Sequence, residues 1–369
     1  MITGLELKNF KCFEKLRVDL KNVNIFTGLN GVGKSTVIQA LLLLRQSYLT
    51  DQDLCRLYLN GRYVELGNSQ DVVFDKAQDD LVGFEVAIDD GKRDARLFSY
   101  EQDTDYLTCA DHKNMKERSG RIDCPLYGDD FVYLSAYRIK PQERYGVIGE
   151  KDLKKRNFGT NGEFALQYLS IYGDNDIENP CVAEDSEKGN TLIRQTRIWM
   201  DRVSPGVSPQ IKVMMDSRAS ELSFEFIEGK EKTNSYKSIN VGFGITYILP
   251  VIVALLSAKE GDLIIIENPE AHIHPAGQRM LGELIARAGA GGAQIMVETH
   301  SEHIINGVRI CVKEKQISKD DVLLAFFYKD KEHGYQHTYR RLQIFEDGKL
   351  SEWPRGFLDE WERALIDLL

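Results

Sequence analysis

The sequence predicts an α/β protein with a mixed central sheet, an antiparallel β lobe and an inserted helical subdomain. Two short apolar runs, Leu263–Ile266 and Ala293–Val297, flank a helical pattern near Gln278–Ala288. Buried strands that alternate with a helix are typical of βαβ units in a parallel sheet. Residues 60–135, in contrast, are rich in short alternating segments, which favour an antiparallel sheet.

The first third of the chain is expected to be mostly strand. Residues 1–20 alternate apolar and polar positions, which predicts a strand pair at a sheet edge. The apolar run Val23–Phe26 continues directly into Thr27 and Gly28, and helical spacing begins after Lys34. Further strands are expected at 61–67, 84–88, 95–100 and 131–135, and the turn Asp89-Asp90-Gly91 predicts a hairpin between the second and third of these.

The strand pattern is lost over residues 137–209, where helices are expected at 164–171 and 191–203. Strands return over 210–229, and the almost wholly apolar run Ile245–Ala258 predicts a buried helix. Strands at 322–328 and 339–345 precede a short amphipathic helix with Phe357, Leu358, Trp361, Leu365 and Leu368. We therefore expect a first lobe at 1–136, a helical subdomain at 137–209, and a second lobe with a C-terminal tail at 210–369.

Composition limits the class of protein. Among 369 residues, 47 are basic and 57 acidic, so the formal net charge of −10 argues against a protein that coats nucleic acid through bulk charge. The densest basic run, Lys151–Arg156, is typical of a solvated face. Six scattered cysteines without a CxxC pair favour a reducing compartment and argue against zinc fingers. The N-terminus does not resemble a signal peptide, and Ile245–Ala258 is too short to span a membrane. A cytoplasmic protein without a membrane segment is expected.

A phosphate-binding loop is the strongest signal. Residues Gly28–Ser35 match GxxxxGK[ST] at every fixed position. The glycines let several backbone N–H groups face one anion, and the N-terminus of the following helix adds partial positive charge. Lys34 is expected to reach the terminal phosphates and Ser35 to bind Mg²⁺. ATP and Mg²⁺ are therefore the expected cofactors.

Three weaker signals follow downstream. The apolar strand at 263–266 ends in Glu267-Asn268-Pro269-Glu270, where one carboxylate can hold Mg²⁺ through water and a second can orient the attacking water. The next strand leads into His300 at the edge where α/β proteins bind ligands, and Ser301 is suited to cap a helix. Gly242-Phe243-Gly244 precedes the buried helix. In isolation, an acidic turn, a structural histidine and a tight turn are the plain alternatives.

The order of these motifs resembles that of an ABC-type ATPase head. More narrowly, the chain resembles prokaryotic ATPases, often labelled AAA-type, that are related to the chromosome-maintenance, recombination and overcoming-lysogenization families. The resemblance covers essentially the whole chain and is carried by Asn9-Phe-Lys-Cys-Phe13, Glu267-Asn-Pro-Glu-Ala-His-Ile-His-Pro275 and Glu298-Thr-His-Ser301. Two further phrases, Tyr133-Leu-Ser-Ala-Tyr-Arg138 and Trp353-Pro-Arg-Gly-Phe357, resemble a subgroup with its own C-terminal domain, some of whose relatives are thought to act beside nucleases in anti-phage systems.

The resemblance implies a set of site residues. The residues that would wrap the phosphates are Asn30, Gly31, Val32, Gly33, Lys34, Ser35 and Thr36. It implies that Gln70 is a weakly matched Mg²⁺-sensing glutamine, that Glu267 supports Mg²⁺ beside Ser35, and that His300 is a switch histidine near the γ-phosphate. Gly242 and Gly244 would form a signature segment that closes over ATP held by a second subunit. An ATP-sandwiched homodimer is therefore implied, and a higher assembly stays open.

Two departures from the family pattern affect catalysis. The usual Asp-Glu pair reads Glu267-Asn268, and an asparagine can orient a water but cannot accept its proton at neutral pH. Either Glu270 substitutes as the base or hydrolysis is slow. The signature segment also lacks the usual serine before its glycines. His272 and His274 suggest a metal site, but no third ligand is evident, so a structural or interface role is favoured.

The leading hypothesis is a dimeric, slowly hydrolysing ATP switch that controls a partner effector such as a nuclease, with anti-phage defence as the context. The sequence shows no nuclease module and no long coiled coil, so the work is expected to belong to the partner. One alternative is a DNA-structure-binding ATPase of repair or recombination. Another is a nucleotide-bound scaffold with weak catalysis, which Asn268 motivates. A transporter ATPase is disfavoured because no membrane-coupling segment is visible.

Overall fold

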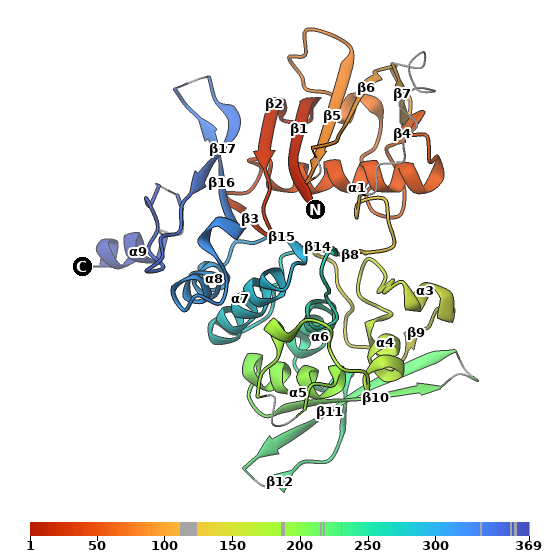
Figure 1. The fold of residues 1–369 in the computed structure, drawn as a ribbon, viewed down its shortest axis with the longest axis vertical. Helices are drawn as coiled ribbons and strands as arrows, with labels where there is room; N and C mark the ends of the chain where they lie inside the picture. The colour runs from red at the N-terminus through yellow and green to blue at the C-terminus, as the bar shows by residue number, and fades with distance from the viewer. Residues whose placement is uncertain are drawn as a thin grey trace.

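A six-stranded sheet forms the centre of the molecule (Figure 1). The computed structural model describes residues 1–89, 91–110, 124–185, 189–214, 216, 218–229, 231–332, 334–354, 356–357 and 360–368. In sheet order, the central strands are β17 (Gln336–Leu342), β16 (Val322–Asp330), β3 (Val23–Gly28), β15 (Gln294–Glu298), β14 (Leu263–Glu267) and β8 (Phe131–Leu134). β17 runs antiparallel to β16, and the other neighbours are parallel. The predicted mixed central sheet is confirmed.

Both faces of this sheet are buried, which explains why its strands are apolar without alternation. Ile264 and Ile266 of β14 face a core shared with the helices of the inserted region and of the second lobe. Leu263 and Ile265 of the same strand face a second core shared with helix α1 (Lys34–Thr50) and the antiparallel lobe. Successive strand residues point to opposite faces, so one apolar run serves two cores.

The antiparallel lobe is a second six-stranded sheet. In sheet order its strands are β2 (Phe13–Asp19), β1 (Ile2–Phe10), β5 (Leu81–Ile88), β6 (Arg93–Ser99), β7 (Tyr106–Cys109) and β4 (Arg56–Tyr58). The predicted pair at residues 1–20 and the predicted hairpin are confirmed as β1–β2 and β5–β6, and β2 is the edge strand. Asp90 of the predicted turn lies outside the described residues.

Two strand predictions in this region are wrong. Residues 61–67 form a turn segment in which only Asn60 and Glu65 pair, because the Gln46 side chain takes up the backbone groups. Its Oε1 accepts hydrogen bonds from the N–H groups of Tyr63 (3.2 Å) and Val64 (3.0 Å). The strand expected at 131–135 exists as β8, but it is a parallel strand of the central sheet rather than of the antiparallel lobe. All four of its residues are buried, as both-face burial requires.

The inserted region contains the predicted helices together with a sheet. Its helices are α3 (Glu150–Lys154), α4 (Ala165–Tyr172) and α5 (Leu192–Val203). Helices α4 and α5 pack beside a five-stranded sheet of β9 (Tyr145–Gly146), β10 (Val207–Met214), β11 (Ala219–Glu228), β12 (Glu231–Lys232) and β13 (Tyr236–Lys237). The boundary expected between residues 209 and 210 falls inside β10, whose apolar residues pack on α4 and α5.

The second lobe contains the predicted buried helix and βαβ unit. α6 (Phe243–Leu256) has Pro250 inside it and is buried from Thr246 onward. α7 (Pro275–Ala290) connects β14 to β15, and α8 (Glu302–Lys313) follows β15. Among the described residues, no helix is long and apolar enough to cross a membrane.

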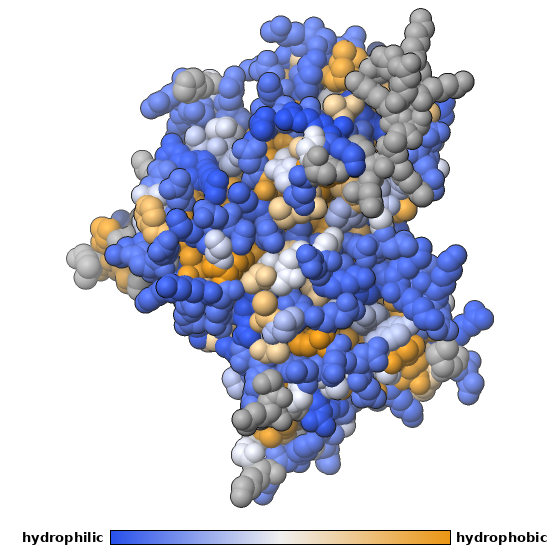
Figure 2. Space-filling view, in the orientation of Figure 1, coloured by the Kyte–Doolittle hydropathy of each residue, from blue (hydrophilic) through white to orange (hydrophobic). Residues whose placement is uncertain are grey.

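The C-terminal tail ends in α9 (Glu360–Leu368), which confirms the predicted helix. Phe357 is buried against Phe326, whereas Leu365 and Leu368 are exposed. Apolar surface gathers around this tail at the left of Figure 2. Arg355, Leu358 and the side chain of Trp361, which the sequence patterns included, lie outside the described residues.

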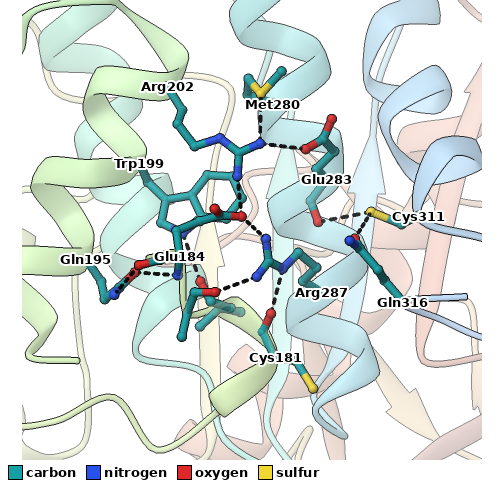
Figure 3. A network of polar contacts seen from close by, with 12 residues as sticks. Cys181, Glu184, Gln195, Trp199, Arg202, Met280, Glu283, Arg287, Cys311 and Gln316 are labelled. Carbon is teal, nitrogen blue, oxygen red and sulfur yellow. Dashed lines mark hydrogen bonds and ion pairs between the residues drawn. The ribbon is translucent and has the colours of Figure 1, made fainter. Parts of the chain in front are cut away.

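A partly buried ionic network joins α5 and the loop at Glu184 to the second lobe (Figure 3). Glu184 pairs with Arg202 of α5 and with Arg287 of α7. Arg202 also pairs with Glu283 of α7 at 2.9 Å. The Trp199 ring packs beside both guanidinium groups, so charge pairing and cation–π contact act at the same junction.

Candidate nucleotide site

The phosphate loop connects β3 to α1, as its sequence context requires. Gly31 and Gly33 have φ angles of 73° and 106°, a region that side-chain-bearing residues rarely adopt. The Lys34 ammonium group donates to the carbonyl oxygens of Gly28 (3.0 Å) and Leu29 (2.8 Å), which holds the loop around it. Burial lowers the pKa of Lys34, and the charges of Glu298 and Glu270 oppose this shift.

A hollow of about 450 Å³ lies beside the loop. Gly31, Lys34, Ser35 and Thr36 line it together with Lys11, at the turn between β1 and β2. Backbone N–H groups, a helix N-terminus and a lysine at one hollow are groups suited to contact the phosphates of a nucleotide. Asn30 and Val32, which were also predicted to wrap the phosphates, are not among the residues that line the hollow, whereas Asp71 and Asp75 are.

The hydroxyl group of Ser35 donates a 2.8 Å hydrogen bond to Oε1 of Glu298. Glu298 ends β15, which lies between β3 and β14 in the sheet. Burial and the nearby charge of Glu267 raise the pKa of Glu298 to about 6, although the Ser35 hydrogen bond opposes the shift. Sequence reasoning did not select Glu298, but its place at the end of the strand that leads into His300 was the available signal.

Glu267 ends β14 in direct register with Glu298. Its Oε2 accepts a hydrogen bond from the N–H of Ala136 at 3.2 Å, and its backbone carbonyl accepts one from Arg138 at 2.8 Å. Burial raises the pKa of Glu267, whereas hydrogen bonds from Ala136 and Tyr133 oppose this. The Glu267 carboxylate, which was predicted to support Mg²⁺ together with Ser35, is thus held from the side of β8, by the backbone of Ala136 just after that strand.

The acidic turn after β14 presents Glu270 to the site. Asn268 has a φ of 43°, its N–H donates to the Glu298 carbonyl at 2.8 Å, and its carbonyl accepts from Arg138 at 2.5 Å. Oε1 of Glu270 accepts a 2.7 Å hydrogen bond from the N–H of His300. Oε2 of Glu270 is buried and has no hydrogen-bond partner within the described part of the chain. Buried polar atoms in proteins are nearly always hydrogen-bonded, so this exception marks Glu270 as a candidate functional residue.

His300 lies at the strand end where it was predicted, with an exposed side chain. Partial burial of the imidazole, and then the charge of Lys34, lower the pKa of His300. Ser301 accepts hydrogen bonds from the N–H groups of His303 (3.1 Å) and Ile304 (3.2 Å), which confirms the predicted helix cap.

The signature segment begins α6. Gly242 is its N-cap, and the side chain of Phe243 is exposed. A Cβ atom at Gly244 would lie 2.1 Å from the carbonyl oxygen of His272, so this close approach requires glycine. The Phe243 and His272 rings are 4.8 Å apart, and His274 caps α7 through a 3.3 Å hydrogen bond from the N–H of Ala276. The two histidines therefore have structural contacts.

Arg138 joins the acidic turn to α6, and sequence reasoning did not select it. Besides the carbonyls of Glu267 and Asn268, its guanidinium group contacts the Tyr247 ring at 4.1 Å. The Tyr247 hydroxyl donates to the carbonyl of Ala136 at 2.5 Å. Burial lowers the pKa of Arg138 to about 10, which leaves it charged at neutral pH.

Two other sequence features lie away from the phosphate loop contacts. Gln70 is exposed in a short 3-10 turn at Ser69–Asp71, and its neighbour Asp71, rather than Gln70, lines the hollow. In the basic run, Lys154 pairs with Glu150 and Lys155 with Asp129, whereas Arg156 is buried against Asp262. The charges of this run are therefore largely compensated by neighbours.

Comparison with known families decides the class of the site. The profile of a family described as "AAA ATPase domain" matches residues 1–118 and 190–305, which together make up more than half of the chain. The chain belongs to this family. The first matched segment of this ATPase contains the phosphate loop, and the second contains Glu267 and His300 at the ends of their strands. Residues 317–368 match a second family, described as a protein of unknown function (DUF3696).

Solved structures confirm the fold of this ATPase. A crystal structure of an Smc head bound to the C-terminal winged-helix domain of ScpA has a TM-score of 0.54 and 14% identity, and the match covers 93% of this chain and 98% of that one. A Pyrococcus furiosus Smc head with an extended coiled coil, bound to the C-terminal domain of ScpA, has a TM-score of 0.52 and 14% identity, with 100% and 99% covered. The fold is thus that of an ABC-type ATPase head. Among curated proteins, no significant match was found.

Proposed function

We propose that this ATPase binds ATP with Mg²⁺ at the phosphate loop and hydrolyses it slowly. The observation that carries the proposal is the convergence of Lys34, Ser35 and Glu270 at one edge of the central sheet, beside an anion-binding hollow. The hydroxyl of Ser35 and the nearby carboxylates are oxygen donors, which suit Mg²⁺. When bound, Mg²⁺ would offset the negative charge of the phosphates.

Glu270 is the residue best suited to accept the proton of the attacking water. One of its oxygens is fixed by the N–H of His300, and the other is buried without a partner within the described residues. Asn268 takes the position of the usual base, but its amide cannot take up a proton. Its backbone is held by Arg138 and Glu298. Slow turnover follows from a base that stands two residues beyond the usual one.

The exposed signature segment supports a dimer in which ATP lies between two copies. Gly242 and Phe243 are open to solvent at the start of α6, where the phosphates of a second subunit's nucleotide can be contacted. The family resemblance supports a partner effector, such as a nuclease in anti-phage defence, that reads the closed state. The DNA-repair alternative draws no support from the basic run, because Lys154, Lys155 and Arg156 are paired with carboxylates.

The decisive experiment measures phosphate release from ATP together with ATP binding. Wild type is expected to bind ATP and release phosphate slowly, Lys34→Ala to lose binding, and Glu270→Gln to bind ATP but lose turnover. Light scattering should show Glu270→Gln as an ATP-dependent dimer. Full turnover in Glu270→Gln would exclude Glu270 as the base, and binding without turnover in wild type would favour the scaffold alternative. A gene neighbour that encodes a nuclease would support the defence context, and a solitary gene among housekeeping functions would contradict it.

A further inference from the structure

The acid that holds the phosphate-loop serine comes from an unexpected strand. Ser35 Oγ lies 2.8 Å from Oε1 of Glu298 on β15, which is the immediate neighbour of β3. Glu267, one strand further away on β14, is the residue that the motif order selects. Glu267 was predicted to support Mg²⁺ together with Ser35, but the hydroxyl of Ser35 donates its hydrogen bond to Glu298.

Glu267 is already engaged on the side away from the phosphate loop. Its Oε2 accepts a hydrogen bond from the N–H of Ala136 at 3.2 Å, and the Tyr133 side chain lies beside the same carboxylate. Both partners lie on or just after β8, which borders β14 on the opposite side from β15 and β3. Arg138 holds the backbone carbonyl of the same residue at 2.8 Å. These contacts fix Glu267 as part of the acidic turn.

We propose that Glu298 is the acidic residue that supports Mg²⁺ through Ser35, and that Glu267 is a positioning residue for the acidic turn. This inference rests on the proposed function, since it concerns Mg²⁺ delivered with ATP to the same site. Carboxylates that hold the ligand of a metal typically change metal affinity by about 10- to 100-fold when removed. The Ser35 hydroxyl is the group through which Glu298 acts.

The charge of Glu298 should affect ATP affinity in opposite directions without and with Mg²⁺. Without Mg²⁺, a carboxylate beside the phosphate loop repels ATP phosphates, because like charges at short range in a partly buried site interact strongly. With Mg²⁺, the same carboxylate attracts the cation that ATP carries. Removing the charge in Glu298→Gln should therefore leave ATP binding in EDTA as tight as in wild type or tighter, and weaken it in Mg²⁺. A purely structural role moves both conditions in the same direction.

The test is a titration of a fluorescent ATP analogue in EDTA and in Mg²⁺, with the ratio of the two dissociation constants as the readout. We call the factor by which Mg²⁺ tightens ATP binding relative to EDTA the gain from Mg²⁺. Glu298→Gln should reduce this gain by roughly tenfold or more, whereas the matched variant Glu267→Gln should retain it. Electron paramagnetic resonance with Mn²⁺ and a non-hydrolysable analogue should show loss of tightly bound Mn²⁺ in Glu298→Gln only. Glu298→Asp, which keeps the charge, should recover part of the gain.

Ser35→Ala covers the case in which Glu298→Gln is unstable, because it removes the same link from its other end. Ser35→Ala should also lose the gain from Mg²⁺, and adding Glu298→Gln to it should change the gain little further, because both residues act on one metal. An unchanged gain in Glu298→Gln, or a loss confined to Glu267→Gln, overturns this inference alone. A wild-type protein that binds no nucleotide in either condition overturns the proposed function as well.

Discussion

The Nδ1 atom of His337 lies 3.1 Å from the carbonyl oxygen of Val32, within the phosphate loop. Because a carbonyl can only accept a hydrogen bond, Nδ1 must carry the proton. The edge of the same imidazole meets the ring of Phe13, at 6.2 Å between centroids. His337 belongs to β17, so the region matched by the family of unknown function contacts the backbone of the phosphate loop directly.

Replacing His337 should loosen the phosphate loop without unfolding the protein. A single hydrogen bond contributes a net of about 0.5–1.5 kcal/mol, so His337→Ala should weaken ATP binding by up to about tenfold. A fluorescent-nucleotide titration measures this. Gln336→Ala, an exposed neighbour on the same strand, is the control and should bind as wild type does. Equal affinities for His337→Ala and wild type would show that the loop does not depend on this contact.

Arg138 should affect turnover more than ATP binding. Its two hydrogen bonds to the carbonyls of Glu267 and Asn268 set the acidic turn, and a lysine cannot reproduce this planar geometry. We expect Arg138→Lys to lower kcat by about tenfold or more while the Kd for ATP changes little. Arg144→Lys, at an exposed arginine paired with Glu221, is the matched control. A fall in ATP affinity with unchanged kcat would contradict the assignment.

Tyr247 tests whether the signature helix communicates with the acidic turn. Tyr247→Phe keeps the aromatic face under Arg138 but removes the hydroxyl bonded to the Ala136 carbonyl. We expect a smaller loss of kcat than in Arg138→Lys. Tyr247→Ala, which also removes the cation–π contact, should approach the Arg138→Lys value. A turnover assay at saturating ATP compares the three. If Tyr247→Ala turns over like wild type, the helix is not coupled to the turn.

Gly244 should tolerate no side chain. A Cβ atom there would meet the His272 carbonyl at 2.1 Å, and backbone cannot move aside as a flexible side chain does. Gly244→Ala should cost about 1–3 kcal/mol, as overpacking typically does. Gly242→Ala is the control, because a methyl group at Gly242 would meet no atom within 4 Å and its φ of −53° is ordinary. Thermal unfolding of the two variants checks this, and equal midpoints would contradict it.

Asp262 should be the most costly single charge to remove. It is fully buried and pairs with both guanidinium nitrogens of Arg156, which is 7% exposed. Removing one partner of a buried ion pair leaves the other charge buried without compensation. Asp262→Asn should therefore lower the free energy of unfolding by roughly 3–5 kcal/mol. Asp130→Asn, at an exposed pair with Lys259, should cost less than about 1 kcal/mol. Urea denaturation gives both values, and similar losses would disprove the distinction.

The strand and helix predictions succeeded where burial follows a simple period. Leu263–Ile266 and Phe243–Leu256 are apolar on all sides and are buried over most of their length. The prediction at 61–67 failed because a single distant side chain, Gln46, satisfies the backbone there and replaces strand pairing. Phe131–Leu134 was correctly predicted as a strand but was assigned to the wrong sheet, because an apolar run does not reveal which strands lie beside it.

The candidate site shows the same division. The turn between β3 and α1 was predicted at the right place because all its residues are contiguous in sequence. Glu298 and Arg138 were not selected, because their roles depend on which strand lies beside which. The order β3, β15, β14, β8 brings Glu298 to Ser35 and turns Glu267 toward the β8 segment.

The sequence by itself determined that this protein has a phosphate-binding loop, a buried parallel sheet and an asparagine at the usual position of the base. These are local properties, set by residue type, spacing and period. Only the tertiary structure decided which carboxylate meets Ser35, which oxygen of Glu270 has no partner among the described residues, and that His337 supports Val32 from 305 positions away. Such contacts join segments far apart in the chain, and hydrogen bonds of this kind depend on strand order and side-chain direction, which no local pattern encodes.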